Sequence, residues 1–372
     1  MRKRSLGIAA IGLSAGLLLA SCGSSSGGSD ASGSDGSSSG GAAKVGVILP
    51  DTTTSTRYTL YDAPLLTKAF KDAGIEADVQ NAGGSASKFT DIATSMIGNG
   101  VKVLLIDSAD PATGAGVEQK AKDAGVKVID YDRVNFGGSA DYYVSFDNVG
   151  VGKLMATTML DCLKADSVTK PQIIQVDGGI DIDNNAVEFA KGANDVLDPL
   201  YKSGDAVKAS EVTVKGWKID TAAATFQQAL TSNGGKVDGV IAANDDIANA
   251  VITVLKNKGL KAAVTGQDAG ISGLQNILTG TQCMTVFKDV SKEADAAAKL
   301  AIALAKGEDP AKAGLDLVDY PDTKIKRTLQ AVLLTPTAIT KDNVQDVIDA
   351  GALKKDQICK GIEAACDSAG LK

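Results

Sequence analysis

Short apolar runs alternate with longer amphipathic stretches from residue 44 onward. The first run, Val45 to Leu49, is closed by Pro50, which is typical of a buried parallel strand. Similar runs follow at residues 77–80, 101–106, 126–130, 172–176, 237–242 and 262–266. Stretches of helical length lie between the early runs, at residues 60–73, 88–98 and 117–124. The pattern predicts repeated strand–helix–strand units.

The number of these units favours two lobes over a single sheet. Four to five units precede residue 147, and a similar number lie between residues 148 and 287. One open sheet of about ten strands is less favourable than two smaller sheets. The sequence therefore predicts an α/β fold with two Rossmann-like lobes, each a doubly wound parallel sheet. Ligands bind beyond the carboxyl ends of such strands, so we expect a cleft between facing lobes.

Polar and aromatic side chains gather where the predicted strands end. A Thr-rich segment leading to Arg57 follows the first run, and Asp132 and Arg133 follow the fourth. The later strand ends carry Asp183, Asn185, Trp217, Asn244, Asp268 and Lys288. Carboxylates and amides accept hydrogen bonds from hydroxyls, cations donate them, and an aromatic face covers the C–H side of a ring. This edge therefore suits a polyhydroxylated ligand.

Composition excludes several classes of function. The 372 residues include 38 basic and 45 acidic side chains, giving a net charge of −7, and no histidine. An acidic balance argues against nucleic acid as a partner, because phosphates need a basic face. The lack of histidine removes histidine-based catalytic triads and histidine-ligated metals. Residues 177–183 lack the spacing of a calcium loop, and no phosphate-binding motif is present, so we expect neither metal nor cofactor.

The first 43 residues predict an export signal and a tether. Arg2, Lys3 and Arg4 precede an apolar stretch at residues 6–20, which is too short for a comfortable membrane span. The sequence Leu-Ala-Ser-Cys ending at Cys22 matches a bacterial lipobox, so residues 1–22 are expected to direct lipidation of Cys22. Residues 23–43 are rich in Gly and Ser and predict a flexible tether. An ordinary signal peptide with an unrelated Cys is the alternative.

Nine short motifs together carry a family resemblance. They are YDR (131–133), YVSFDN (143–148), DNNA (183–186), GW (216–217), AND (243–245), GQDA (266–269), GTQ (280–282), MTV (284–286) and LLTP (333–336). With these motifs the chain resembles the periplasmic sugar-binding proteins of ABC transporters, which have the type I two-lobe fold. The resemblance spans nearly all of residues 44–350 and is strongest to xylose-binding members.

The resemblance implies the residues of a sugar site. The family's polar sugar contacts fall on Arg57, Asp132, Arg133, Asp183, Asn185, Asn244, Asp268 and Lys288. Trp217 falls on an aromatic residue that packs against the sugar ring, and Tyr58 falls where xylose-binding members carry a second aromatic, a Trp. The resemblance implies D-xylose as the first candidate ligand, followed by other pentoses and aldohexoses.

The resemblance also implies how the lobes are connected and used. Lobe I is expected to comprise residues 44–147 and 288–316, and lobe II residues 148–287 and 317–372, including a C-terminal tail. A three-crossover hinge is expected near residues 147, 287 and 316–333. The expected protein is a monomer, held by its lipid on the outer face of the cell membrane, that closes on a sugar and delivers it to an ABC permease.

Several residues have a second interpretation. Trp217 could be a core residue, although its flanking Lys215, Gly216 and Lys218 are not a core pattern. Asp183 could cap the following helix, contact the ligand, or do both. Asp245 and Asp246 are expected to cap a helix, which leaves Asn244 for the ligand, whereas Asp107 and Asp110 stay open between the two roles.

Charge balance separates binding from catalysis. The expected site holds three carboxylates (Asp132, Asp183, Asp268) and three cations (Arg57, Arg133, Lys288), which suits a neutral sugar. Cationic neighbours are expected to keep these carboxylates ionised, which disfavours a glycosidase acid. We therefore expect no enzyme. A binding protein for a signalling receptor is the main alternative, and a sugar-acting enzyme is a weaker one.

Four cysteines remain beyond Cys22. An even number outside the cytoplasm predicts two disulfides. Cys359 and Cys366 close a short C-terminal loop and are expected to pair. Cys162, at the end of a lobe II helix, and Cys283, at the start of a strand, form the second candidate pair.

Overall fold

The computed structural model describes residues 44–55 and 57–372. These residues belong to one compact unit. The expected signal peptide, the lipidation site Cys22 and the tether all lie outside the described residues.

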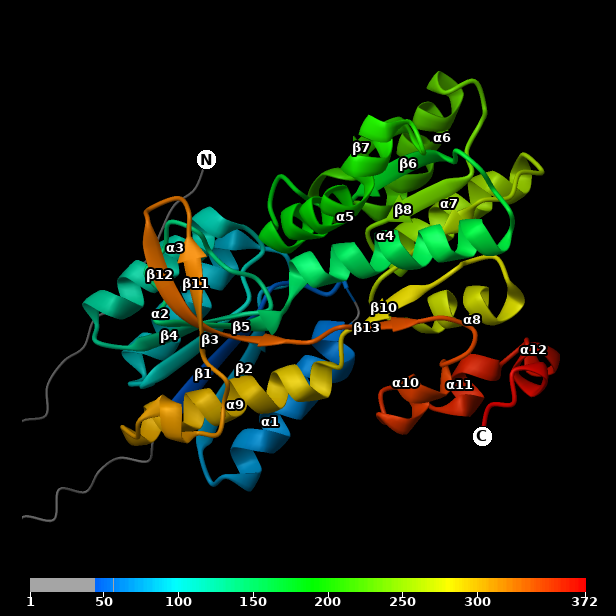
Figure 1. Ribbon diagram of the computed structural model, residues 1–372. Helices are drawn as coiled ribbons and strands as arrows, with labels where there is room; N and C mark the ends of the chain where they lie inside the picture. Colours follow the sequence, from blue (N-terminus) through cyan, green and yellow to red (C-terminus); the bar gives the residue numbers. More distant parts are fainter. Residues whose placement is uncertain (1–43, 56) are drawn as a thin grey trace, which may run out of the picture. The chain divides into compact units, whose positions relative to one another are not determined.

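Lobe I is built on one seven-stranded sheet of order β11-β12-β5-β4-β3-β1-β2 (Figure 1). All neighbouring strands are parallel except β11, which runs antiparallel to β12. The strands are β1 (Lys44–Leu49), β2 (Glu76–Asn81), β3 (Val103–Ile106), β4 (Lys127–Tyr131), β5 (Tyr142–Phe146), β11 (Val318–Asp322) and β12 (Arg327–Leu334). The central strands are apolar on both faces because helices cover both sides.

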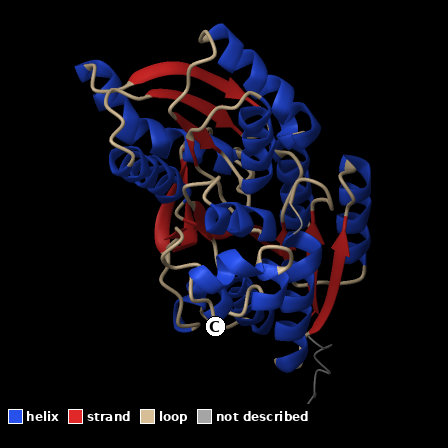
Figure 2. Ribbon diagram, turned by 90° about the vertical axis from the view of Figure 1, so that its right-hand side faces the viewer, coloured by secondary structure: helices blue, strands red, loops and turns tan. Residues whose placement is uncertain are grey.

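Two separate hydrophobic clusters lie on the two faces of this sheet. On one face pack α1 (Ala63–Asp72) and α9 (Val290–Lys306), and on the other α2 (Ala86–Gly98) and α3 (Pro111–Asp123). A short π-helical turn, Tyr58–Asp62, leads into α1, and a 3-10 turn, Pro310–Lys312, follows α9. Helices on both faces of the strands are visible in Figure 2.

Lobe II contains a four-stranded parallel sheet of order β7-β6-β8-β9. Its strands are β6 (Gln172–Asp177), β7 (Val207–Thr213), β8 (Gly239–Ala242) and β9 (Ala263–Val264), and its helices are α4 (Asn148–Ala165), α5 (Asn184–Ser203), α6 (Ala222–Ser232), α7 (Asp245–Asn257) and α8 (Ile271–Thr279). Two 3-10 turns, Lys215–Trp217 and Ile219–Thr221, follow β7. The expected α/β fold with two doubly wound lobes is confirmed.

A small ribbon and a tail complete lobe II. Strand β10 (Thr285–Phe287) pairs antiparallel with β13 (Thr337–Ile339). The tail forms α10 (Gln345–Asp349), α11 (Lys355–Cys359) and α12 (Glu363–Ser368), which share a hydrophobic cluster with α8. The C-terminal tail therefore packs against α8.

The chain crosses between the lobes at three places, and one expected boundary is wrong. The crossings lie between β5 and α4, between β10 and α9, and between β12 and β13. Residues 317–334 were expected in lobe II, but β11 and β12 extend the lobe I sheet beside β5. The third crossing is therefore at residues 335–336 rather than within 316–333.

Two glycines bring α4 and α5 into backbone contact. A Cβ atom at Gly152 would lie 2.0 Å from the Phe189 carbonyl oxygen, and one at Gly192 would lie 2.0 Å from that of Val149. Helix α4 starts at the first crossing and α5 begins beside the expected site. This close packing fixes the start of α5 relative to the hinge.

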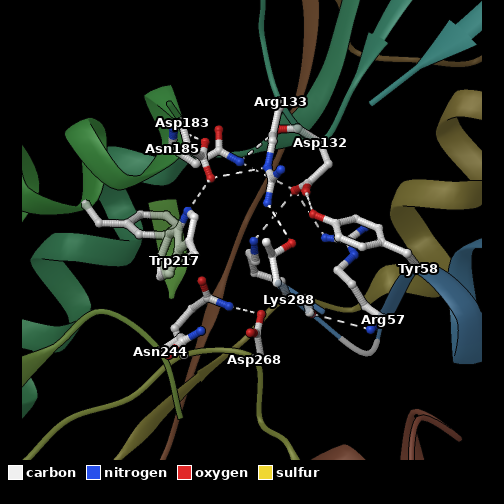
Figure 3. A pocket seen from close by; sticks show the side chains of 14 residues that line it. Arg57, Tyr58, Asp132, Arg133, Asp183, Asn185, Trp217, Asn244, Asp268 and Lys288 are labelled. Atoms are coloured by element: carbon white, nitrogen blue, oxygen red, sulfur yellow. Dashed lines mark hydrogen bonds and ion pairs between the residues drawn. The ribbon is translucent and has the colours of Figure 1, made fainter. Parts of the chain in front are cut away.

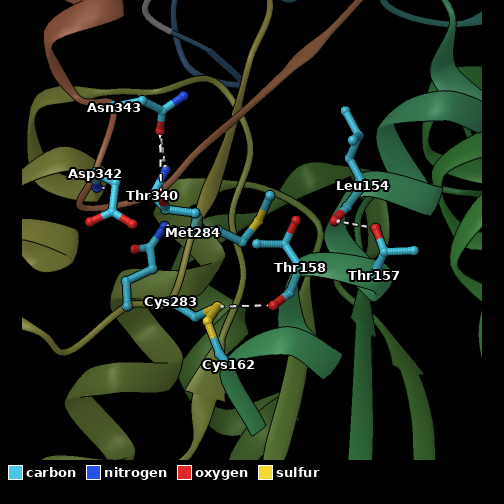
Figure 4. The surroundings of a disulfide bond; sticks show 10 residues. Leu154, Thr157, Thr158, Cys162, Cys283, Met284, Thr340, Asp342 and Asn343 are labelled. Atoms are coloured by element: carbon cyan, nitrogen blue, oxygen red, sulfur yellow. Dashed lines mark hydrogen bonds between the residues drawn. A yellow bond between two sulfur atoms is a disulfide. The ribbon is translucent and has the colours of Figure 1, made fainter. Parts of the chain in front are cut away.

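Both predicted disulfides are present. Cys162 at the end of α4 is bonded to Cys283 just before β10, across 121 residues of sequence (Figure 4). Cys359 is bonded to Cys366 across 7 residues, which ties α11 to α12. The first bond links the two ends of the lobe II segment that lies between two of the crossings.

Candidate ligand-binding cleft

All ten side chains expected from the sequence line one cavity between the lobes (Figure 3). Lobe I contributes Arg57, Tyr58, Asp132 and Arg133, and lobe II contributes Asp183, Asn185, Trp217, Asn244 and Asp268, with Lys288 at the second crossing. Thr54, Ser55, Phe189 and Gln267 line it as well. Sequence analysis missed Phe189, since it lies inside helix α5 and no local pattern sets it apart from core residues.

Backbone strain marks three of these residues independently of their chemistry. Asp132, Trp217 and Asp268 have φ angles of 59°, 54° and 99°, in the region that favours glycine. Non-glycine residues in this region cost energy and concentrate at functional sites. Each of the three ends a strand or follows one, so the strain turns its side chain toward the cavity.

Asp132 is the centre of the lobe I half of the site. One carboxylate oxygen, Oδ1, accepts from Arg57 Nη1 at 3.1 Å and lies 3.8 Å from Lys288 Nζ, and Oδ2 accepts from the Tyr58 hydroxyl at 3.0 Å. Burial alone would raise the pKa of Asp132, but Arg57, Lys288 and Arg133 outweigh it and lower this pKa to about 2. Asp132 is therefore an ionised acceptor.

Arg57 is held by three carboxylates. It donates twice to Asp62, at 2.8 and 2.9 Å, and once each to Glu293 at 2.6 Å and Asp132 at 3.1 Å. These bonds use four of its five N–H groups, so at most one remains for a ligand. Asp62 also accepts from the Tyr131 hydroxyl. Arg57 therefore acts mainly by positioning Asp132.

Arg133 joins the two lobes. Its Nε lies 3.2 Å from Asp183 Oδ2 on lobe II, and its Nη2 donates to Thr54 Oγ1 at 3.3 Å. Its guanidinium also lies 5.7 Å from the centre of the Tyr58 ring. Among the described residues the Thr54 bond uses one of its five N–H groups and the ion pair with Asp183 faces a second, so Arg133 keeps donors for a ligand.

Asp183 and Trp217 form the lobe II wall. Asp183 caps α5, because its Oδ1 accepts from the Asn185 backbone N–H at 2.9 Å, and its Oδ2 accepts from Trp217 Nε1 at 3.0 Å. Any Cβ at Gly178 or Gly179 would meet the Trp217 ring, at 2.1 and 2.6 Å. The glycine pair therefore makes room for the indole. Trp217 is both a core residue and part of the cavity wall.

Asn185 connects the lobes through backbone. Its Nδ2 donates to the Asp132 carbonyl oxygen at 2.9 Å, and its Oδ1 accepts from Asn148 Nδ2 at 2.9 Å and from the Tyr143 hydroxyl at 3.3 Å. Both ends of its amide are thus engaged. We infer that the Asn185 side chain helps to hold the two lobes together when the cleft is closed.

The expected division of roles around Asn244 is wrong. Asn244 Oδ1 caps α7 by accepting from the Ile247 N–H at 2.9 Å, and Asn244 also lines the cavity. Asp245 is not the cap: it is buried and accepts from the Gly270 N–H and Gln282 Nε2, both at 2.8 Å. Burial raises the pKa of Asp245 to about 7. Asp110 does cap α3, through the Thr113 N–H at 2.9 Å.

Lys288 and Asp268 carry the most available polar atoms. Lys288 is 6% exposed, and its ammonium lies 5.6 and 5.9 Å from the ring centres of Phe189 and Phe146. Within the part of the chain that the structure describes, its nearest carboxylate is Asp132 at 3.8 Å, beyond hydrogen-bond distance. Asp268 accepts from Gln267 Nε2. Both side chains can therefore meet a hydroxyl group.

The three expected carboxylates and the three expected cations all line the cavity, but further buried carboxyls lie behind them. Asp62, Asp107 and Glu293 are also fully buried here and add three carboxyls. Burial raises the pKa of Glu293 to about 7 and that of Asp107 well above its ordinary value. It also raises the pKa values of Asp183 and Asp268, against the attraction of Arg133 and Lys288. Only Asp132 of the three expected carboxylates has a lowered pKa.

Asp62 and Glu293 were not predicted from the sequence, and Asp107 was left open between a helix cap and a ligand contact. Glu293 is 236 residues from its partner Arg57, and Asp62 precedes a helix without any motif. Asp107 follows β3, which was the only available signal. Its carboxylate lies 3.9 Å from Arg133 Nε, and neither oxygen has a hydrogen-bond partner among the described residues.

The cavity is small as the lobes stand. Its volume is about 30 Å³, room for one or two water molecules. A monosaccharide therefore enters only if the lobes separate and the Arg133–Asp183 pair opens. A larger cavity of about 650 Å³ adjoins it and shares Ser55, Arg57, Asp268 and Lys288 with it.

No metal cluster and no membrane-crossing helix occur in the parts described. Within residues 44–55 and 57–372, no group of three or more Cys, Asp or Glu side chains could hold a metal ion. The helices of the same region are too short or too polar to cross a bilayer.

Comparison with known proteins now identifies the family. A sequence profile described as a periplasmic binding protein domain matches residues 45–309. This chain belongs to the periplasmic binding protein family. Its two-lobed architecture is the type I fold of that family.

Three relatives show the extent of the similarity. The D-xylose-binding periplasmic protein of Escherichia coli is 34% identical over 292 residues, which cover 77% of this chain and 84% of that protein. A multiple sugar-binding periplasmic receptor of Rhizobium radiobacter is 34% identical over 334 residues, covering 84% and 92%. The solved carbohydrate transporter solute-binding protein of Chloroflexus aurantiacus, in complex with D-glucose, has a TM-score of 0.75 at 30% identity and covers 84% and 97%. These are binding proteins, and this chain is a binding protein rather than an enzyme.

Proposed function

We propose that this protein captures a neutral monosaccharide in the interlobe cleft and delivers it to an ABC permease. The observation that carries the proposal is the convergence of ten polar and aromatic side chains from both lobes on one cavity. Lys288 and Asp268 offer a donor and an acceptor, Asn244 offers an amide, and Trp217 offers an aromatic ring (Figure 3). A sugar held by several such groups bridges the lobes.

D-Xylose is the proposed ligand, ahead of other pentoses and aldohexoses. The Escherichia coli and Haemophilus influenzae relatives are D-xylose-binding proteins at 34% and 35% identity. Tyr58 is one position at which this chain departs from xylose-binding members, and its hydroxyl is bonded to Asp132. Its ring is thereby held against one wall of the cavity, where its size helps to set which sugars fit.

Capture proceeds by lobe closure. In an open form Arg133 and Asp183 face water, and a sugar can reach Lys288 and Asp268. Contacts to both lobes favour the closed form, so the ligand shifts the population toward it. Lipidation at Cys22 and the tether 23–43 would then hold this binding unit on the outer face of the cell membrane, near its permease, as a monomer.

A sensory role is the second candidate. The Rhizobium radiobacter relative is described as a receptor, and it covers more of this chain than the Escherichia coli protein does. In this role the closed form is presented to a signalling receptor. Uptake of labelled sugar by cells lacking the gene distinguishes the two: transport predicts a loss of uptake, whereas sensing alone predicts none.

Calorimetric titration tests the proposed binding directly. Residues 44–372 are titrated with D-xylose, D-ribose, L-arabinose, D-glucose and D-galactose. We expect at least one sugar, D-xylose first, to saturate with a Kd of about 1 µM or below, since roughly −8 kcal/mol requires only a few charged hydrogen bonds. Absence of heat with all five sugars contradicts the proposal.

A further inference from the structure

A tyrosine of lobe I reaches across to lobe II outside the sugar cavity. The Tyr320 hydroxyl, on β11, donates to Glu188 Oε1 on α5. Asn184 Nδ2, one turn earlier on α5, lies 3.5 Å from the same hydroxyl. Tyr320, Asn184 and Glu188 do not line the cavity.

The Tyr320 ring is fixed by lobe I alone. It stacks on Phe136 with ring centres 6.0 Å apart and an interplanar angle of 12°, and it packs against Tyr143 at 5.1 Å. The residue is 8% exposed. Because the ring belongs to the lobe I core, the hydroxyl meets Glu188 only when lobe II lies in the closed position.

Tyr143 connects this contact to the cleft. Its hydroxyl donates to the Asp132 carbonyl oxygen at 3.1 Å and lies 3.3 Å from Asn185 Oδ1. Tyr320 therefore packs on Tyr143, whose hydroxyl holds the backbone of Asp132, a candidate sugar-binding residue. It does so without pointing any polar atom into the cavity.

We propose that Tyr320 and Glu188 form an interlobe clasp that stabilises the closed form and so sets how tightly and how long sugar is held, but not which sugar. The inference rests on the proposed sugar-binding function of the cleft. Apparent affinity scales with the fraction of protein in the binding-competent form, so a contact made only on closure changes Kd for every ligand by the same factor. Hydrogen bonds to a charged acceptor are strong enough to matter here.

The test uses Tyr320→Phe, which keeps the ring and removes the hydroxyl. We expect Kd to rise about tenfold for D-xylose and by the same factor for a second bound sugar, with faster release in stopped-flow measurements. Tyr142→Phe, at a half-buried tyrosine on strand β5 of the same sheet, is the matched control and should change neither value. Glu188→Gln keeps an acceptor oxygen and should give a smaller loss, and combining it with Tyr320→Phe should add nothing further.

Two results overturn the clasp: an unchanged Kd and release rate in Tyr320→Phe, or a loss that differs between sugars. Small-angle scattering without sugar separates this failure from failure of the proposed function. If no sugar binds, the clasp still predicts a larger radius of gyration for Tyr320→Phe than for the wild type. Equal radii of gyration then contradict it.

Discussion

The two lobes meet in contrasting ways in two regions of their interface. The first region is a polar seam, made of Arg133–Asp183, Asn185–Asp132 and Tyr320–Glu188. In the second region, beside α1, the lobes leave an apolar groove of about 650 Å³, whose walls include Leu60, Tyr61, Ile271 and Leu353. Leu60 is 61% exposed and Ile271 is 39% exposed.

The difference shows where the closed geometry is specified. Hydrogen bonds and ion pairs need defined distances and angles, so the polar seam holds only one arrangement of the lobes. Apolar contacts are non-directional, and open space separates the large side chains that line the groove. We infer that the seam determines the closed form, whereas the groove tolerates change.

The largest expected effect comes from breaking the seam at its ion pair. Arg133→Ala removes the link to Asp183 and leaves that carboxyl buried without its cation, which costs several kcal/mol. We expect sugar affinity to fall more than about 100-fold by calorimetry, with the fold intact by circular dichroism. Arg327→Ala is the matched control, because its side chain donates to the Ala140 carbonyl oxygen inside lobe I. Equal losses in both variants would contradict a role for the seam.

A smaller effect is expected at the amide link. Asn185→Ala removes the hydrogen bond to the Asp132 carbonyl oxygen and should weaken binding about tenfold. Asn194→Ala lies on the same helix, away from the cavity, and should leave Kd unchanged. If calorimetry gives the same Kd for Asn185→Ala and the wild type, the link between lobes at this point does not contribute.

Beneath the seam, two of the three carboxyls around Arg57, Asp132 and Glu293, respond oppositely to pH. Asp132, with its pKa lowered to about 2, contributes stability that is present above its unfolded pKa and is lost as pH falls toward 2. Glu293, with its pKa raised to about 7, binds a proton in the folded state that the unfolded state has released, so stability falls as pH rises from about 4.5 to 7.

Glu293→Gln tests this response. Gln cannot ionise, so the Tm of the variant should fall less between pH 5 and pH 8 than that of the wild type, with a difference of about 2–4 °C. Asp177 and Asp245 have pKa values raised to about 6 and about 7, but both are present in each protein, so their effect cancels in the comparison. Parallel Tm curves would show that Glu293 does not titrate in this range.

The smallest effect is expected in the groove. Leu60→Ser changes an exposed side chain, and such changes alter stability by less than about 0.5 kcal/mol. We expect less than about a twofold change in sugar Kd by calorimetry. A tenfold loss would place the groove among the contacts that specify closure.

Much of the fold follows from continuous apolar runs. Residues 45–49 and 172–176 predict β1 and β6 because strands buried on both faces carry no polar alternation. Strand β11 was missed because it is a short edge strand, VDYPD, in which one Asp and the Pro are exposed and no apolar run marks it. Because β11 was not predicted, nothing in the sequence assigned residues 317–334 to lobe I.

Within the candidate site, too, some residues could be predicted from the sequence and others could not. The ten expected residues lie at strand ends, where a parallel sheet brings separate segments together. Asp62, Glu293 and Tyr320 lie elsewhere, and the last two act through partners far away in the sequence, Arg57 at 236 residues and Glu188 at 132 residues. Only the packed tertiary structure reveals such pairs.

Trp217 offers the most direct test of the central claim, that sugar binds in this cleft. It is the only tryptophan in the chain, and its indole lines the cavity and donates to Asp183. Titration of residues 44–372 with D-xylose should give a saturable change in tryptophan fluorescence with the same midpoint as the calorimetric curve. A calorimetric curve that saturates while the fluorescence of Trp217 stays constant would show that sugar binds elsewhere.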